Sequence, residues 1–472
     1  MSGDPLAAVA ATGIPAWLVG GAVRDRLLER PTTDFDVVVA GDPRPVARAA
    51  ARGAGGHAFE LSEAFGAWRV VARDHTWQLD VLGLGPLSLE QDLARRDLTV
   101  NAIAQPLAAG GGAVGADPVD PFGGVGDLRA GRLRMVSEHS FSDDPLRALR
   151  LARLAVQLGF VVEPETAARA RASAPQLADV APERAFAELR ALICAPGAVA
   201  GLELMDELGV TAALLPELAA LDGVQQSRFH HLDVAGHTRA VLAETIAVVE
   251  DPRMLGLTGE VAARLSDALA QPLANELTRG QALRFGALLH DIAKPRTRGV
   301  SGEGRVTFMG HDALGAEMAS AILGRLRASE RLRGHVGALA RHHLRLGFLV
   351  HRMPLDRRDV YDYLHAVAPV GVDVTMLSVA DRLATRGDDA QRAIALHVQL
   401  AREMLVDALD WEADPPRPPV RGDALAAALG IAPGPRIGEL LEELQAAAFA
   451  GEVTGPAQAI ELARRRIDAG EA

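Results

Sequence analysis

A Gly-Gly turn followed by two alternating carboxylates is the feature that most constrains this chain. An apolar run at 17–19 precedes Gly20 and Gly21, and Asp34 and Asp36 follow at the start of a second apolar run. Residues two apart on a strand face the same way, so a strand over 34–39 directs both carboxylates at one spot. Converging carboxylate oxygens suit Mg²⁺, which completes its shell with water and substrate phosphates. The segment therefore predicts a metal site that handles phosphates.

The two glycines indicate where those phosphates would bind. Gly20 and Gly21 allow close backbone approach to an anion, and a helix beginning near Ala22 would point its N–H groups at it. Arg24 offers further charge-assisted contacts. Each piece alone is also explained by an ordinary turn or strand end, but the two in this order favour nucleotidyl transfer, in which two metal ions stabilise an in-line displacement.

Four further segments follow in a fixed order, at 95–104, 120–124, 143–147 and 183–189. Together with 17–39 they resemble motifs A to D and the neck element of the class II tRNA nucleotidyltransferases, which include CCA-adding enzymes and bacterial poly(A) polymerases. The resemblance implies nucleotide contacts from Arg96, Asp97 and Asn101 in motif B. Motif D departs from the family in one place, where Asp143 replaces the usual glutamate.

Motif D also has a physical interpretation. Asp144 and Arg147 stand three apart on a predicted helix, so they share a face and can present acceptors and donors to a Watson–Crick edge. The resemblance implies that this pair selects the incoming C and then A. The alternative is an ordinary salt bridge on a solvated helix. Arg150 and Arg153 continue the same face, and either nucleotide binding or a structural role is open for them.

Asp80 is the candidate for a third catalytic carboxylate. It lies in the alternating segment 77–82, which predicts a strand, although a solvent-facing aspartate fits there equally. The connection that follows, at 83–88, is short. Its length resembles family members that add only CC, and a complete CCA-adding enzyme with a tight loop is the alternative.

A second set of metal-type residues occurs on predicted helices. The order of these residues resembles the HD phosphohydrolase superfamily, which implies a divalent metal whose identity the sequence does not give. A lone buried histidine is usually an ordinary core residue, and an aspartate before an arginine is often a cap. The apolar run before His290, however, places a His-Asp dyad on a buried face, where unpaired polar groups are costly and metal ligation removes the cost. The resemblance implies one metal held by His237, His290, Asp291 and Asp381, and a second held by His311 with His342 or His343.

Composition and length predict an α+β protein of several domains. Its 472 residues are 49% hydrophobic but only 4% aromatic, which favours helices over most of the chain. We expect a nucleotidyltransferase head with a small mixed β-sheet at 1–135, followed by an all-α neck for templating and RNA binding at 136–225. An HD body at 226–410 and a tRNA-binding helical tail at 411–472 follow, and a proline-rich linker over 411–419 separates the two.

Charge and cysteine content bear on the binding partner and on the cellular compartment. A net charge of −12 argues against a nucleic-acid partner, but all basic side chains except Lys294 are arginines, and a local arginine stripe along the neck and tail can bind an RNA backbone. The single cysteine, Cys194, excludes an intramolecular disulfide, so a reducing cytoplasm is expected. The sequence contains no run of about 20 apolar residues, so no membrane span is predicted.

The sequence therefore predicts a template-independent enzyme that adds CCA, or only CC, to tRNA 3′ ends from CTP and ATP with Mg²⁺ in the head. If active, the HD site would resemble family members that remove phosphate or open 2′,3′-cyclic phosphate at RNA 3′ ends. Two alternatives are open. One is a bacterial poly(A) polymerase, and the other is a metal-dependent phosphohydrolase whose head only binds RNA.

Overall fold

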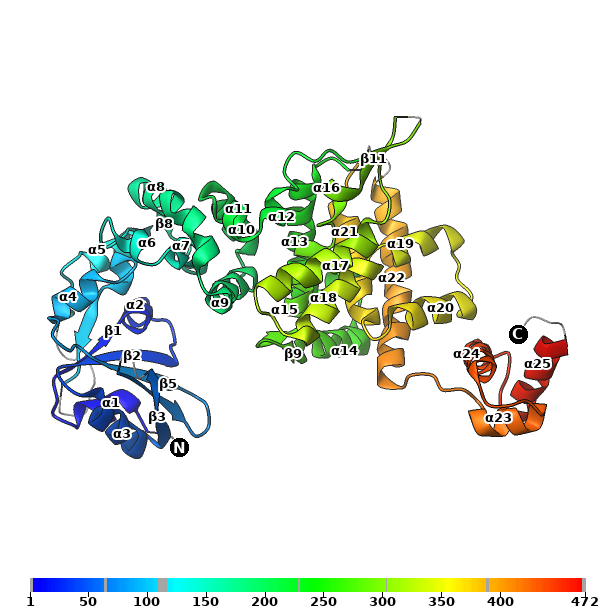
Figure 1. The fold of residues 1–472 in the computed structure, drawn as a ribbon, viewed down its shortest axis with the longest axis horizontal. Coiled ribbons are helices and arrows are strands. Elements are labelled where there is room, and N and C mark those ends of the chain that lie inside the picture. The colour runs from blue at the N-terminus through cyan, green and yellow to red at the C-terminus, as the bar shows by residue number, and fades with distance from the viewer. Residues whose placement is uncertain are drawn as a thin grey trace. The chain divides into compact units, whose positions relative to one another are not determined.

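A computed structural model describes residues 3–62, 66–108, 117–227, 230–302, 304–387 and 390–468. The chain divides into two compact units, Met1–Leu214 and Leu215–Ala472. The first contains a mixed sheet and a set of helices, and the second is mostly helical (Figure 1). This arrangement confirms the predicted α+β class.

The sheet of the first unit has six strands in the order β3-β4-β5-β2-β1-β6. Only the central pair, β2 and β5, is parallel, and all other neighbours are antiparallel. The sheet is therefore mixed, as predicted. Its strands are β1 (Ala16–Val19), β2 (Asp34–Val39), β3 (Gly56–Ser62), β4 (Ala67–Ala72), β5 (Gln78–Gly83) and β6 (Ala104–Pro106).

Apolar side chains cover both faces of this sheet. Helices α1 (Pro5–Ala10) and α3 (Pro43–Ala54) pack together, and α3 covers β3, β4 and β5 (Figure 1). The opposite face is covered by a separate buried cluster. This cluster includes Val38 of β2 and Leu93 of α4 (Leu89–Ala94). Because period-2 alternation places Asp36 on the same face as Val38, the carboxylates lie at the border of this second core.

The segment that resembles motif C has a structural role. Asp120 accepts hydrogen bonds from the backbone N–H groups of Gly124 and Val125, at 2.7 and 2.9 Å, at the start of α5 (Gly124–Ala130). A Cβ atom at Gly124 would lie 2.1 Å from the carbonyl oxygen of Thr99. The glycine therefore lets α5 pack directly on the motif B turn.

The remainder of the first unit is helical. Helix α2 (Gly21–Leu27) follows the Gly-Gly turn, and β7 (Arg132–Leu133) pairs with β8 (Val161–Val162) in a small parallel ladder. The other helices are α6 (Ser140–Asp143), α7 (Leu146–Leu158), α8 (Pro164–Ser173), α9 (Pro182–Ile193), α10 (Ala198–Glu207) and α11 (Val210–Leu214).

The body of the second unit is a group of packed helices. Arg279 at the start of α15 joins three of them, since it forms ion pairs with buried Asp373 on α21 and with Glu412 on α22. The helices are α12 (Pro216–Ala219), α13 (Val234–Glu250), α14 (Gly259–Ala270), α15 (Arg279–Leu289), α16 (Lys294–Thr297), α17 (His311–Arg325), α18 (Glu330–His342), α19 (Arg345–Leu349), α20 (Arg357–Val367), α21 (Gly371–Ala384) and α22 (Ala390–Ala413). Two short hairpins, β9 (Pro272–Ala274) with β10 (Leu277–Thr278) and β11 (Arg298–Val300) with β12 (Val306–Phe308), complete it.

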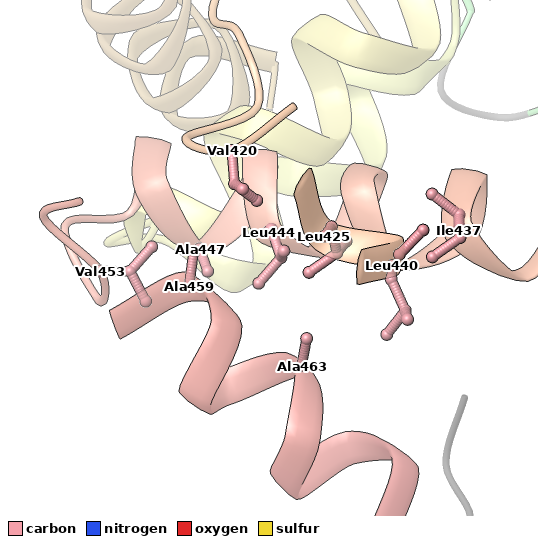
Figure 2. Close-up of a cluster of buried hydrophobic side chains, with 10 residues drawn as sticks. Val420, Leu425, Ile437, Leu440, Leu444, Ala447, Val453, Ala459 and Ala463 are labelled. Carbon is pink, nitrogen blue, oxygen red and sulfur yellow. The ribbon is translucent and has the colours of Figure 1, made fainter. Parts of the chain in front are cut away.

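The predicted linker begins later than expected. Residues 411–413 belong to α22, because the Trp411 ring packs 5.4 Å from Tyr361 and 5.6 Å from Phe449, centroid to centroid. Beyond it, α23 (Gly422–Leu429), α24 (Pro435–Phe449) and α25 (Pro456–Asp468) enclose a core that includes Leu425, Leu444 and Ala459 (Figure 2).

Within the described residues, no single helix is long and apolar enough to cross a membrane; α20 and α21 pass that test only as a pair, which is bent by 100°.

Candidate functional site

Parallel pairing of β2 and β5 brings two predicted catalytic carboxylates together. Asp36 and Asp80 occupy paired positions in the register, while Val37 faces the opposite side and is fully buried. Asp34 and Asp36 are both exposed, on one side of β2, as the alternation predicted. Phe35 is only half-buried, so the core contact expected of it is partial.

Asp80 has a fixed partner on the neighbouring strand. Arg69 of β4 donates two hydrogen bonds, from Nε and Nη2, to the two carboxylate oxygens of Asp80, both at 2.7 Å. A bidentate guanidinium holds the carboxylate in one orientation and neutralises it. Asp80 is thus neither a simple solvent-facing residue nor a free metal ligand.

The environment of Asp36 favours a bound cation. Burial raises the pKa of Asp36 above its ordinary value and Asp80 adds to the increase, whereas Arg96 opposes it. Asp36 as a residue is exposed, but it lines the cleft, where surrounding protein groups remove part of the hydration of its carboxylate. Gly20 lies against this site at φ +74°, and a Cβ there would lie 2.7 Å from Nη1 of Arg96 and 3.3 Å from Oδ2 of Asp36. Glycine is therefore required both by the backbone conformation and by the space.

A cleft of about 310 Å³ lies next to Asp36. That volume is at the lower end of small-molecule sites. Most residues predicted to bind nucleotide line it, whereas Asp34, Asp80, Arg24 and Arg153 are not among its lining residues. The lining residues are Gly20, Gly21, Asp36, Leu82, Arg95, Arg96, Asp97, Asn101, Asp144, Leu146, Arg147, Arg150 and Arg184.

Asp97 organises the motif B side of the cleft. Its Oδ1 accepts hydrogen bonds from Leu98 N at 2.8 Å and Asn101 Nδ2 at 2.9 Å, and its Oδ2 forms an ion pair with Arg150 Nε at 2.8 Å. Burial opposes ionisation, but Arg150 and these hydrogen bonds outweigh it, so the pKa of Asp97 is lowered. Asp97 thus positions Asn101 and Arg150 toward the cleft.

Arg24 and Arg153 do not line the cleft, and each has a protein partner beside it. Arg24 is buried, pairs with Asp25, and donates from Nη1 to Oδ1 of Asn101 at 2.8 Å. It orients a cleft residue without lining the cleft. Arg153 forms an ion pair with Glu188 of α9. It holds the neck helices together, as the structural interpretation of that helix face allowed.

The motif D pair is arranged differently from the prediction. Asp144 precedes α7 in an extended conformation, so it is not on the same helix as Arg147. Its Oδ2 accepts a hydrogen bond from Nη2 of Arg184 at 2.6 Å. Arg147 donates to the backbone carbonyls of Ser140 at 2.8 Å and Arg95 at 2.7 Å. Arg147 contacts Asp144 through the backbone, with Arg147 N donating to the carbonyl oxygen of Asp144 at 3.0 Å, and both residues line the cleft.

Sequence reasoning missed Arg184 and Arg95 as cleft residues. Arg184 lies in the neck element at 183–189, for which the resemblance predicts no cleft residue, and it reaches the cleft from α9. Arg95 precedes the predicted Arg96 in motif B. The signal in both cases was a charged side chain inside an already identified motif.

The second unit brings six of its predicted ligands into two groups. His237, His290 and Asp381 form one group, and Asp291, His311 and His343 form the other; within each, the potential ligand atoms lie within 4.8 Å of one another. Three of these six residues stand at helix ends. His290 and His343 terminate α15 and α18, and His311 begins α17.

Asp291 lies between the two groups. Its Oδ2 is 3.1 Å from Nε2 of His290 and 3.7 Å from Nε2 of His237. Its Oδ1 is 3.4 Å from Nε2 of His311 and 3.8 Å from Nε2 of His343. One carboxylate therefore faces both groups with different oxygens, which is the geometry of a bridging ligand.

Backbone carbonyls orient three of the imidazoles. The Nδ1 atoms of His290, His311 and His343 lie 2.8, 2.6 and 2.7 Å from the carbonyl oxygens of Ala287, Phe308 and Ala340. Such a contact assigns the proton to Nδ1 and leaves Nε2 as the acceptor that a metal requires.

The polar atoms at this centre fit a metal. Nε2 of His237, His290 and His311 and both carboxylate oxygens of Asp291 are buried and form no hydrogen bond of good geometry within the described residues, although they contact one another and their neighbours closely, as Nε2 of His237 does at 3.0 Å from Oδ1 of Asp381. Burying such atoms without a partner is costly, and coordination removes the cost. Lys294 supplies positive charge here, with Nζ 2.6 Å from Oδ2 of Asp291.

The ionisation states of Asp291 and His343 agree with ligation, whereas burial lowers the pKa of His290 but the adjacent Asp291 outweighs it, so that the pKa of His290 is raised. Burial opposes ionisation of Asp291, but His290 and Lys294 outweigh it and hold its pKa well below the ordinary value. Burial lowers the pKa of His343 to about 4, so this imidazole is neutral at physiological pH. Anionic carboxylates and neutral imidazoles are the forms that bind metal.

The structure decides between His342 and His343. His343 is buried and faces Asp291, whereas His342 is half-buried and its Nδ1 accepts a hydrogen bond from Arg345 at 2.9 Å. Consecutive residues at a helix end point in different directions. His342 is therefore not brought to the centre, and only His343 completes the second group.

Three family models match successive parts of the chain. The "Poly A polymerase head domain" matches residues 16–82 and 74–134, the "Probable RNA and SrmB- binding site of polymerase A" matches 159–221, and the "HD domain" matches 257–386. The chain is also 37% identical over 456 residues to the A-adding tRNA nucleotidyltransferase of Deinococcus radiodurans, covering 95% of both chains. The chain belongs to the class II tRNA nucleotidyltransferase family, with an HD domain.

Other members of the tRNA nucleotidyltransferase family are also similar to this chain over most of its length. The CC-adding tRNA nucleotidyltransferase of Thermus thermophilus is 35% identical, over 93% of this chain and 90% of that protein. The Multifunctional CCA protein of Halorhodospira halophila is 34% identical over 69% of this chain and 72% of that protein.

Solved structures share the fold. A CCA-adding enzyme solved with CTP aligns with a TM-score of 0.64 at 20% identity, covering 99% of this chain and 95% of that one. The Thermotoga maritima CCA-adding enzyme complexed with tRNA aligns with a TM-score of 0.60 at 19% identity, covering 98% of this chain and 94% of that one. At this identity the likeness concerns the architecture alone.

Proposed function

We propose that this protein adds nucleotides to the 3′ end of tRNA from CTP or ATP. The observation that carries the proposal is the cleft beside Asp36, which combines a catalytic carboxylate, a glycine turn and converging arginines. Names of family relatives that match most of this chain support tRNA as the acceptor. They favour this function over poly(A) addition and over an HD hydrolase with an RNA-binding head.

Different residues of the head would bind the metal, admit the triphosphate and orient the carboxylates. Asp34 and Asp36 would hold Mg²⁺, which supplies activation of the attacking 3′-hydroxyl and stabilisation of the departing pyrophosphate. Gly20 and Gly21 let the triphosphate approach the backbone. Arg69 fixes Asp80 next to Asp36.

Base selection would fall to the other side of the cleft. Asp144, held by Arg184, presents a carboxylate acceptor, and Arg147 presents guanidinium donors from a separate backbone segment. An acceptor and a donor at fixed positions can read the edge of an incoming base. Anchoring by Arg184 and by backbone carbonyls limits how far either group can move.

We infer further that the product is part of CCA rather than the whole. The two relatives described above with at least 90% coverage on both sides are a CC-adding and an A-adding enzyme. The short connection at 83–88 is compatible with CC-only and with full CCA addition, and the Deinococcus relative adds A-only addition to these possibilities. The short β5–α4 connection, closed by the Ser88 capping box on α4, supports limited addition.

One experiment tests both statements. The protein is incubated with Mg²⁺, all four nucleoside triphosphates and three tRNAs that end before CCA, after C and after CC, and products are read at single-nucleotide resolution. Arrest after CC, or extension of the third substrate alone by A, supports partial addition. Extension of all three to CCA contradicts it but retains the tRNA function, and ATP-only tailing of any RNA contradicts both.

For the HD body we propose a divalent metal centre built on His237, His290, Asp381, Asp291, His311 and His343. Its support is the set of buried ligand atoms that lack hydrogen bonds of good geometry. Such a centre would supply a bound water as nucleophile for a phosphoester. Metal analysis of the purified protein, with the His290→Ala and Asp291→Ala variants, tests it.

A further inference from the structure

The buried cluster on the catalytic face of the head sheet does not reach the edge strand β3. This face carries Asp36, and the cluster that covers it includes Val38 and Leu93 but no described residue of β3 or β4. Phe59 of β3 is 47% exposed. One exposed apolar side chain needs no explanation by itself, so the position of Phe59 on the sheet decides what it can do.

The strand register places Phe59 in line with the catalytic carboxylates. Phe59 pairs with Arg69 of β4, and Arg69 pairs with Asp80 of β5. Asp80 pairs in turn with Asp36 of β2. Residues directly opposite each other on neighbouring strands lie on the same face. These four side chains therefore form one row across the sheet, and the spacing of strands puts Phe59 roughly 14 Å from Asp36.

The opposite face of the same strands shows which way Phe59 points. Trp68, next to Arg69 in β4, is buried, and the guanidinium groups of Arg44 and Arg48 on α3 each lie 5.5 Å from the centre of its ring. Successive residues of a strand point to opposite faces, so Arg69 and its pair Phe59 point away from α3. Helix α3 therefore does not cover the Phe59 ring.

The cleft that we assign to the nucleotide lies on the other side of Asp36. Gly20 and Arg96 are among its lining residues, and none of those residues belongs to the described parts of β3 or β4. The strand order β3-β4-β5-β2-β1 sets Asp36 between the glycine turn, which follows β1, and Phe59 on β3. In an in-line displacement the attacking and leaving oxygens lie on opposite sides of the phosphorus. With the triphosphate at the glycine turn, the attacking 3′-hydroxyl approaches from the side of Phe59.

Arg69 supplies positive charge between Phe59 and the carboxylates. Its Nε and Nη2 bind Asp80, while its Nη1 has no hydrogen-bond partner within the part of the chain that the structure describes. The side chain is partly exposed. A guanidinium fixed in this way can present its remaining N–H groups to a phosphate. The row thus offers an aromatic ring, then a phosphate contact, then the reaction centre.

We infer that Phe59 stacks with the base of an unpaired nucleotide that precedes the 3′-terminal nucleotide of the acceptor RNA. The backbone of that RNA end would pass Arg69 on its way to Asp36. The inference rests on the proposed nucleotidyl transfer and adds a positioning residue for the acceptor, outside the nucleotide cleft. Aromatic side chains on a sheet face stack with unpaired bases, and such stacking tolerates any base. It therefore suits an acceptor whose upstream nucleotide differs from one RNA to another.

The test separates binding of the acceptor from binding of the nucleotide. The substrate is a tRNA with whichever of the three 3′ ends described above the protein extends. Abasic versions of this tRNA remove the base at one unpaired position at a time. KM for the RNA and KM for the nucleoside triphosphate are measured for wild-type protein, Phe59→Ala and Phe59→Trp, and circular dichroism confirms folding.

Phe59→Ala should raise the KM for RNA about tenfold and leave the KM for the nucleotide unchanged, because one contact between a base and an aromatic ring is lost. Phe59→Trp keeps an aromatic ring and should keep the wild-type KM for RNA. One abasic position should raise the wild-type KM by a similar factor and have no further effect in Phe59→Ala, since the contact is already absent. Glu60→Gln is the matched control, because Glu60 is exposed and pairs with Trp68 on the opposite face; neither KM should change.

Three outcomes would overturn the inference. An unchanged KM for RNA in Phe59→Ala, or the same effect of every abasic position in both proteins, means that Phe59 does not contact the acceptor. An equal rise in the KM for the nucleotide shows a general disturbance of the head. A wild-type dimer that dissociates in Phe59→Ala, seen by sedimentation equilibrium with the KM for RNA unchanged, assigns the exposed β3 edge to a second copy of the chain. Absence of any nucleotide addition by wild-type protein contradicts the proposed function itself, and the inference with it.

Discussion

Arg69 and Asp80 form a bidentate ion pair on adjacent strands, with both N–O distances at 2.7 Å, and Asp80 occupies the register position paired with Asp36 on β2. The carboxylate that sequence alternation suggested as a third metal ligand is thus already occupied by a guanidinium. This relationship ranks the three carboxylates, because a fixed and neutralised group contributes less to metal binding than a free one.

We therefore expect Asp36→Ala to lower the rate of nucleotide addition roughly hundredfold or more, since a catalytic metal is worth several kcal/mol. Asp80→Asn should cost clearly less, on the order of tenfold. Rates with labelled CTP or ATP at saturating Mg²⁺ check the order, and circular dichroism confirms folding. Equal losses in the two variants would mean that Asp80 leaves Arg69 and binds metal directly.

Arg184→Ala should reduce discrimination between CTP and ATP about tenfold, because Asp144 loses the charged donor that fixes its carboxylate. Arg184→Lys keeps the positive charge but loses the planar guanidinium, so its discrimination between CTP and ATP should lie between those of the wild-type protein and Arg184→Ala. Ratios of kcat/KM for the two nucleotides are the measurement. An unchanged ratio with a lower overall rate would assign Arg184 to triphosphate binding.

Metal should stabilise the second unit. Binding to the folded state alone adds about 2.7 kcal/mol to the free energy of unfolding at a metal concentration 100-fold above Kd. We expect chelation to lower Tm in wild-type protein but not in His290→Ala. His342→Ala is the matched control, because this half-buried neighbour of His343 does not face the ligands; it should keep both the metal content and the chelator response. Loss of metal in His342→Ala would contradict the assignment.

His397 should make the protein less stable in mild acid. Burial lowers its pKa from 6.5 to about 4, and its Nε2 lies 3.1 Å from Oγ of Ser378. The unfolded chain therefore binds a proton that the folded chain does not, so stability is fully present above pH 6.5 and falls as the pH decreases toward 4. The lowered pKa of His397 contributes about 3 kcal/mol to the free energy of unfolding above pH 6.5.

Denaturant unfolding of wild-type protein and His397→Gln at pH 7 and pH 5 measures this effect. The difference in unfolding free energy between the two pH values should be smaller in the variant, because glutamine does not titrate in this range. The same pH dependence in both proteins would show that other buried groups, such as His230 with its pKa also lowered to about 4, carry the effect.

Local patterns were sufficient for part of the head. Alternation predicted the strand that carries Asp34 and Asp36, and the glycine turn predicted α2 at the correct place. Both depend on neighbours only a few residues apart, where strand and helix periodicities hold. The helix carrying Asp144 was predicted too early, because Pro145 lets α7 begin only at Leu146 and leaves Asp144 extended.

The sequence alone determined the family, the strand that presents Asp34 and Asp36, and the set of residue types able to bind metal, since these depend on local order and chemistry. The tertiary structure alone decided which partner each charged group has. It paired Asp80 with Arg69, Asp144 with Arg184 and Arg153 with Glu188, and it chose His343 over His342. Such choices depend on which distant segments pack together and how each helix is rotated. Where the groups are largely buried, as for Arg153 with Glu188 and for His343, an unpaired polar group would be costly, so burial also makes the choice energetically important.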